Sequence, residues 1–103
     1  MKIISNKKIY DTEQAQEITA VRHSGRNNIS WYEETLYVSD NGAWFLAGEG
    51  GPLSHYGIDV GEGNREGGRK LTPMSINEAI SWLELHQKYA IIEEYFFDQL
   101  EPA

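Results

Sequence analysis

The chain has 103 residues, a formal net charge of −7 and no cysteine. This length fits one domain, 1–103, and the lack of cysteine excludes disulfides and thiolate metal sites. Sixteen acidic against nine basic residues disfavour direct binding of nucleic acid, because affinity for phosphate comes mainly from clustered Lys and Arg. An acidic surface suits a partner with a basic surface, although acidity also simply keeps a small protein soluble.

The N-terminal segment predicts one short strand, at either Lys2–Ser5 or Lys8–Tyr10. Asp11 then predicts the N-cap of a short helix, because its carboxylate can accept hydrogen bonds from the backbone N–H groups that follow. We expect this helix to end by Val21–His23. The segment lacks the apolar run of a signal peptide, and no window holds the roughly 18 apolar residues of a membrane span. We therefore expect a soluble, intracellular protein with no membrane partner.

The clearest element is a hairpin formed by Tyr32–Ser39 and Ala43–Gly48. Asn41-Gly42 between them is typical of a two-residue type I′ turn, because both residues tolerate positive φ. That turn would place Val38 opposite Phe45. Both faces of the hairpin carry apolar side chains, so we expect it to be central and covered by helices on at least one side.

The segment Gly48–Gly68 holds eight of the ten glycines and indicates a long loop. Its glycines complete no phosphate-binding motif, so we expect them to supply positive φ and close backbone approach. Within it, Tyr56–Val60 is a candidate short strand. Arg69–Thr72 then predicts an edge strand that Pro73 ends.

The C-terminal part is predicted to be helical. Ser75 and Glu78 form the Ser-x-x-Glu pattern of a capping box, and a change in the phase of the apolar stripe near His86 predicts a break there. The stripe of the first helix comprises Ile76, Ala79, Ile80 and Leu83. The stripe of the second comprises Tyr89, Ile92, Tyr95, Phe96 and Leu100. The elements together predict an α+β fold, in which a small antiparallel sheet built on the central hairpin packs against the C-terminal helices and one short N-terminal helix.

No catalytic, cofactor-binding or metal-binding pattern stands out in the sequence. The histidines, His23, His55 and His86, lie at no metal-ligand spacing. The adjacent Glu33 and Glu34 are on a strand, so they point to opposite faces and make a poor acid–base pair. We therefore expect a protein that is not an enzyme, with no cofactor, while a site that pairs His55 with Glu49 remains an alternative.

Two features favour binding of a partner. Residues 75–103 carry six acidic side chains against one lysine, a net charge of −5, although a solvated helix face has the same composition. Aromatic residues flank the glycine-rich loop, and such residues serve either as interface anchors or as core. The candidate partner-binding residues are Glu34, Glu49, Tyr56, Glu62, Glu84, Glu93, Glu94 and Asp98.

Four segments resemble a known family: Lys8–Ala15, Tyr32–Tyr37, Gly42–Tyr56 and Pro73–Trp82. The run Trp-Phe-Leu-x-Gly-Glu-Gly-Gly-Pro at 44–52 is the most specific. The chain is similar to small proteins of low-GC bacteria, their phages and mobile elements, a family that includes a type II-A anti-CRISPR protein that inhibits Cas9. The segment Gly57–Gly68 departs from the family pattern.

The resemblance implies a non-catalytic inhibitor, cytoplasmic in a bacterial host cell, that binds a Cas9 effector or its nucleic-acid-binding surface. It carries over no catalytic residue, and it leaves open whether guide RNA loading, DNA binding or cleavage would be blocked. Two alternatives remain: an antitoxin-like or immunity-like protein-binding module of a mobile element, and a small-molecule-binding domain that uses the loop Glu49–Tyr56. The oligomeric state is open.

Overall fold

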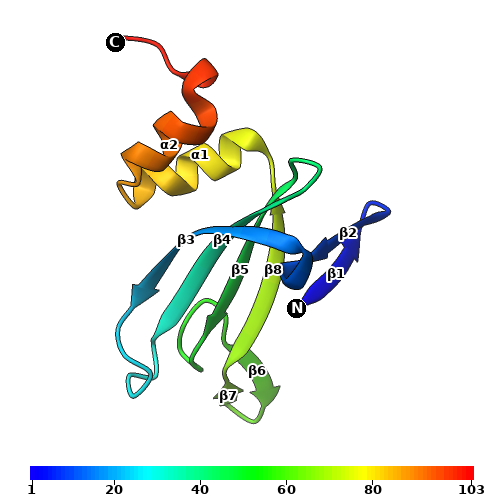
Figure 1. Cartoon of the computed structure of the whole chain (residues 1–103). Coiled ribbons are helices and arrows are strands. Elements are labelled where there is room, and N and C mark those ends of the chain that lie inside the picture. Colours follow the sequence, from blue (N-terminus) through cyan, green and yellow to red (C-terminus); the bar gives the residue numbers. More distant parts are fainter.

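A computed structural model describes residues 1–103 and shows a four-stranded antiparallel sheet with two helices at one end (Figure 1). The sheet has the order β3-β4-β5-β8. Its strands are β3 (Ala15–His23), β4 (Tyr32–Ser39), β5 (Trp44–Gly50) and β8 (Gly68–Met74). The predicted α+β class, with the β4–β5 hairpin at the centre of the sheet, is confirmed.

Two small hairpins extend from this sheet. The N-terminal one pairs β1 (Lys2–Ser5) with β2 (Lys8–Asp11), so both candidate N-terminal strands form and pair with each other. The other pairs β6 (Ile58–Gly61) with β7 (Asn64–Glu66), at the end of the sheet away from the helices (Figure 1). The predicted strand at Tyr56–Val60 is thus β6, which begins two residues later.

The predicted N-terminal helix is only one 3₁₀ turn, η1 (Thr12–Gln14). Asp11 caps this turn as expected, because its Oδ1 accepts a hydrogen bond of 3.0 Å from the backbone N–H of Glu13. From Ala15 the chain is a strand, and the helical prediction is wrong there. Pairing with β4 along the whole of β3 overrides the helix-start signal, and three β-branched residues favour that outcome: Ile18, Thr19 and Val21. A bulge at Ile18 interrupts the alternation that would have marked a strand.

The β4–β5 turn has three residues rather than two, so the predicted register is wrong by one position. Gly42 adopts a φ of 81°, and Gly42 N–H donates to Ser39 O at 2.9 Å. This is the arrangement of a type I turn closed by a left-handed glycine. Val38 therefore lies opposite Trp44, not Phe45. A one-residue shift exchanges the faces of one strand relative to the other, which decides which side chains enter the core.

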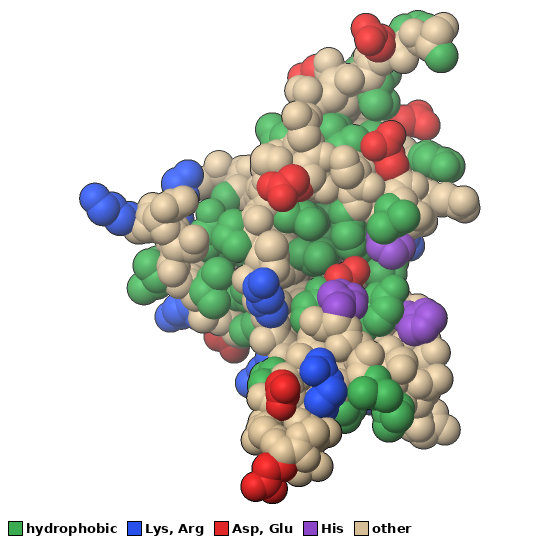
Figure 2. Space-filling view, turned by 180° about the vertical axis from the view of Figure 1, so that it is seen from behind, with side chains coloured by type: hydrophobic (Ala, Val, Ile, Leu, Met, Phe, Trp, Pro, Cys, Tyr) green, Lys and Arg blue, Asp and Glu red, His purple; other side chains and the backbone are tan.

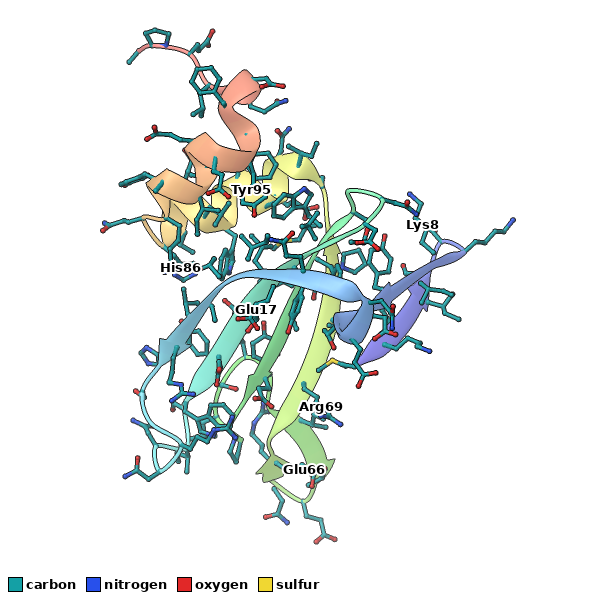
Figure 3. All side chains as sticks on the ribbon, viewed as in Figure 1. Lys8, Glu17, Glu66, Arg69, His86 and Tyr95 are labelled. Carbon is teal, nitrogen blue, oxygen red and sulfur yellow. The ribbon has the colours of Figure 1, made fainter.

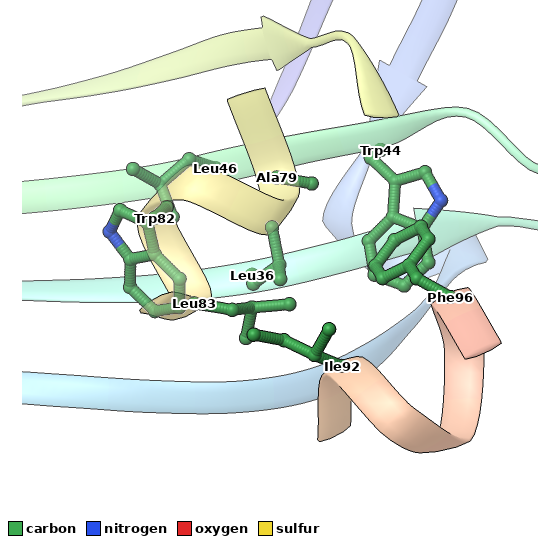
Figure 4. Packing of buried hydrophobic residues seen from close by; sticks show 8 residues of the cluster. All are labelled: Leu36, Trp44, Leu46, Ala79, Trp82, Leu83, Ile92 and Phe96. Carbon is green, nitrogen blue, oxygen red and sulfur yellow. The ribbon is translucent and has the colours of Figure 1, made fainter. Parts of the chain in front are cut away.

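The main core lies between one sheet face and the helices (Figure 4). Its buried members come from β4, β5, α1 and α2: Leu36, Trp44, Leu46, Ala79, Trp82, Leu83, Ile92 and Phe96. A smaller cluster of Tyr10, Phe45 and Leu71 packs on the opposite face beneath the N-terminal hairpin. The sheet is thus covered on both faces, but by different elements.

The edge strand β8 continues through Pro73 to Met74, beyond the predicted stop. Pro73 lies opposite Phe45 and has no N–H to donate. An edge strand tolerates this loss because only one of its sides pairs with the sheet. The prediction of an edge strand is therefore confirmed and its end is corrected.

The C-terminal helices are α1 (Ile76–Leu85) and α2 (Tyr89–Phe96), followed by the 3₁₀ turn η2 (Phe97–Gln99). The capping box is present, since Ser75 Oγ accepts from Glu78 N–H at 3.1 Å and Glu78 Oε1 accepts from Ser75 N–H at 2.9 Å. The break at His86 is also present. Neither helix has the length and apolar character needed to cross a membrane.

The buried helical side chains differ from the predicted stripes. Ala79, Leu83, Ile92 and Phe96 are buried as expected, and Trp82 joins them. Four predicted members are exposed instead: Ile76, Tyr89, Tyr95 and Leu100. The helices meet only one end of the sheet (Figure 1), so a narrower face than the sequence suggested is enough to cover it.

Candidate functional site

Glu34 is the one buried charged residue of the protein, with 8% of its surface exposed. It lies on β4 on the face that also carries Leu36. Tyr56 OH donates to its Oε2 at 2.5 Å, and Trp82 Nε1–H donates to its Oε1 at 3.0 Å. His55 Nε2 lies 3.3 Å from Oε2. We call these four residues the Glu34 network; it joins the sheet, the loop before β6 and helix α1.

Gly48 makes this network possible. It lies opposite Glu34 on β5, and a Cβ added there would stand 1.9 Å from the ring of Tyr56. The Tyr56 ring therefore crosses the strand where Gly48 has no side chain. Ser54 fixes the loop, because its hydroxyl donates to Gly51 O at 2.8 Å and accepts from Tyr56 N–H at 3.1 Å. The glycine at position 48 serves close approach and not positive φ.

The network fixes the protonation of Glu34 and Tyr56 at neutral pH. Burial raises the pKa of the Glu34 carboxyl, but the hydrogen bonds from Tyr56, Trp82 and His55 outweigh it and leave the pKa below its usual value. Burial and the bond to Glu34 raise the pKa of Tyr56 far above its usual value. Glu34 is thus ionised and Tyr56 protonated. None of the surface hollows of the protein is lined by Glu34, His55 or Tyr56.

His55 belongs to this network, and the other two histidines lie beside it. His23 stacks on Tyr32 with ring centroids 5.0 Å apart, and His55 meets the same ring edge-on at 4.9 Å. His86 lies 4.6 Å from Trp82. Figure 2 shows the histidine side chains close together on one face, next to a carboxylate. No group of three or more His, Cys, Asp or Glu side chains is placed to hold a metal ion.

On the opposite face of the sheet, Glu33 and Glu49 pair with arginines. Glu33 Oε2 lies 3.0 Å from Arg22 Nη2 and 3.6 Å from Arg26 Nη2. Arg26 also bonds Glu49 Oε1 at 3.1 Å. Glu33 and Glu34 thus point to opposite faces as predicted. The alternative that pairs His55 with Glu49 is wrong, because Glu34 is the acid beside His55.

The helical end, residues 75–103, leaves its charges unpaired. Six acidic side chains, Glu78, Glu84, Glu93, Glu94, Asp98 and Glu101, are exposed, and none has an ion pair. Large apolar side chains are exposed beside them: Leu85 is 76% exposed and Phe97 72%. This surface therefore combines free negative charge with uncovered apolar groups.

The eight candidate partner-binding residues fall into separate places. Glu34 and Tyr56 bond to each other within the Glu34 network, and four others lie on the helical end: Glu84, Glu93, Glu94 and Asp98. Glu49 is on the opposite sheet face, and Glu62 is in the β6–β7 turn. Figure 3 shows Tyr95 on the helical end, while Arg69 and Glu66 lie at the far end of the sheet.

Sequence reasoning missed Trp82 and His55 as partners of Glu34, and it missed Gly48 as the position that leaves room for the Tyr56 ring. Glycines two residues apart within a strand, Gly48 and Gly50, were the available signal, because they mark one strand face that another segment approaches closely. Comparison with known proteins assigns no family: no family model, no curated protein and no solved structure matches this chain.

Proposed function

We propose that this chain is a non-catalytic binding protein that docks its acidic helical end onto a basic surface of a protein or ribonucleoprotein. The observation that carries the proposal is the separation of charge along the fold. The helical end carries six acidic residues and one basic residue, whereas residues 1–74 carry ten acidic and eight basic residues. Most of the net charge of −7 is therefore displayed by one small part of the molecule.

The pairing of the charges supports the same proposal. Three carboxylates of the sheet, those of Glu33, Glu34 and Glu49, already have partners within the chain, such as Arg26 for Glu49. No carboxylate of the helical end has an ion pair, so their negative charge remains available to steer and fix a basic partner. Leu85, Tyr89 and Phe97 supply exposed apolar and aromatic area of the kind that anchors interfaces.

A Cas9 effector is the concrete partner that we propose. The run at 44–52 resembles a family that includes a type II-A anti-CRISPR protein, and Cas9 holds its guide–target duplex in a positively charged channel. An acidic domain seated in that channel blocks nucleic acid by charge complementarity and needs no bond-making step. The Glu34 network does not suggest catalysis, because its carboxylate is already bonded by three donors.

Cleavage of target DNA by purified Cas9 orthologues, with and without this protein, tests the proposal. We expect reduced cleavage and co-elution of the two proteins on a sizing column. In the variant E84Q/E93Q/E94Q, inhibition should weaken at least about tenfold, since close interfacial charge pairs are worth 1.4 kcal/mol or more. The matched control E13Q/E17Q/E66Q removes the same charge from exposed positions outside the helical end and should retain inhibition.

Full cleavage and no complex with several orthologues would remove Cas9 as the partner. Affinity purification from the native host then decides between the remaining readings. Capture of one neighbouring gene product, lost in E84Q/E93Q/E94Q, supports an antitoxin-like or immunity-like module. Equal binding by the helical variant and by E13Q/E17Q/E66Q would overturn the assignment of the binding surface to the helical end.

A further inference from the structure

A hollow of about 200 Å³ opens on the helical end, between α1, α2 and the segment after η2. Five residues line it: Glu84, Tyr89, Ile92, Glu93 and Leu100. Tyr89, Ile92 and Glu93 stand one turn apart on α2, at i, i+3 and i+4, so they share one helix face. The capped helix α1 and the turn η2 hold the other two members in place.

The lining is apolar at its base and acidic at its mouth. Ile92 is buried in the core, while Tyr89 and Leu100 are about half exposed. Glu84 and Glu93 are exposed carboxylates, and neither has an ion pair within the chain. An occupant that matches this lining has an aliphatic stem and a cationic tip.

We propose that this hollow receives an arginine side chain from a basic segment of the partner protein. The inference rests on the proposed function and names the anchor of its interface. The methylene groups of arginine suit Ile92 and Leu100, and its planar cation stacks on an aromatic face such as Tyr89. Its fork of N–H donors bonds carboxylates in pairs, which the compact ammonium group of lysine does not do.

Charge complementarity extends beyond the hollow. The only basic residue of the helical end is Lys88, and it forms no ion pair with the lining acids. Two apolar side chains that line the hollow, Tyr89 and Leu100, are about half exposed. The segment that binds here therefore places apolar residues next to its arginine, so that both kinds of uncovered surface are used.

An NMR titration of the whole protein with a defined peptide tests the proposal. The probe is a capped five-residue peptide with one arginine between two leucines, and the control carries citrulline, which has the shape of arginine without its charge. We expect backbone amide shifts centred on Glu84, Tyr89, Ile92, Glu93 and Leu100. Citrulline should weaken binding at least about tenfold, and lysine by a smaller factor.

Two neighbouring positions on α2 provide a matched pair of variants. E93Q removes a carboxylate that lines the hollow, and E94Q removes one that does not. We expect E93Q to weaken binding of the arginine peptide about fivefold or more and E94Q by less than about twofold, with unchanged thermal unfolding of both. Equal weakening by the two variants, or shifts spread evenly over the helical end, would overturn the proposal.

A competition experiment with spermine tests whether the hollow binds a protein segment or a free polyamine. Spermine has several cationic groups but no guanidinium, so it should displace the peptide poorly at physiological salt. Displacement at equal concentration with the same shifts would contradict an arginine anchor. If E84Q/E93Q/E94Q abolishes partner binding while E93Q alone and E94Q alone weaken it equally, the proposed function stands and the hollow is not its anchor.

Discussion

The carboxylates of the sheet and those of the helical end, residues 75–103, have opposite surroundings. On the sheet, Glu34 accepts bonds from three side chains and Glu49 pairs with Arg26. On the helical end, Glu84 and Glu93 have no cationic partner and stand beside exposed apolar groups. Residue type alone therefore does not tell whether a glutamate is bonded within the fold or left without an ion pair at the surface, because this depends on the donors around it.

The difference follows from the cost of removing a charge from water. A buried carboxylate is tolerated only where hydrogen-bond donors replace its hydration, and Glu34 has that set of donors. An exposed carboxylate keeps its water and contributes little to folding. Substitutions at the two ends should therefore separate stability from binding.

The largest effect is expected from Glu34→Ala. This substitution leaves Tyr56 OH and the buried indole N–H of Trp82 without their acceptor, and it also opens space in a packed region. We expect the free energy of unfolding, measured by urea titration, to fall by about 3 kcal/mol. Glu93→Ala on the helical end should change it by less than about 0.5 kcal/mol. Equal losses for the two variants would contradict the contrast between the ends.

A second substitution tests the close approach that the network needs. Gly48→Ala drives a Cβ into the Tyr56 ring and should cost about 2 kcal/mol of unfolding free energy. Gly25→Ala, where a Cβ would meet only the end of the Asn27 side chain at 3.1 Å, should be nearly neutral. In a Tyr56→Ala background the penalty at Gly48 should disappear, because no ring remains there. An undiminished penalty would show that the clash is with something else.

Local signals predicted the elements that local chemistry controls. Ser75 and Glu78 predicted the capping box and the start of α1, and Asn41-Gly42 predicted the central hairpin. The same kind of signal failed at Asp11, because a cap cannot extend a helix against the pairing of β3 with β4. The hairpin register failed because Gly42 alone, and not Asn41, adopts positive φ.

Local sequence signals could not predict the Glu34 network. Glu34, His55 and Trp82 are far apart in the chain, and only the folding of the loop and of α1 onto the sheet brings them together. Alternation along β4 predicted that Glu33 and Glu34 separate, but not which of them is buried. The acidic character of the helical end, in contrast, needs no long-range contact and was readable from composition.

The pH dependence of stability sharpens the comparison further. The pKa of Glu34 in the folded protein lies below its usual value. Its stabilising contribution is therefore fully present above the unfolded pKa of about 4.3 and is lost as the pH falls through the folded pKa. We expect the unfolding free energy of the wild type to fall from pH 6 to pH 3 more steeply than that of Glu34→Gln. If the unfolding free energies of the wild type and of Glu34→Gln fell in parallel, other carboxylates would account for the acid sensitivity.

The smallest effect on the unfolding free energy is expected from E84Q/E93Q/E94Q, the variant with the largest change in net charge. E84Q/E93Q/E94Q removes three negative charges, yet none of these residues has an ion pair to lose. The unfolding free energy at low salt should therefore stay within about 0.5 kcal/mol of the wild type, with any change toward greater stability because repulsion on the helical end is relieved. Added NaCl screens the same repulsion, so it should stabilise the wild type more than the variant. A clear loss of stability in the variant would mean that these carboxylates stabilise the fold. The contrast between the sheet and the helical end would then no longer support the helical end as the proposed binding surface.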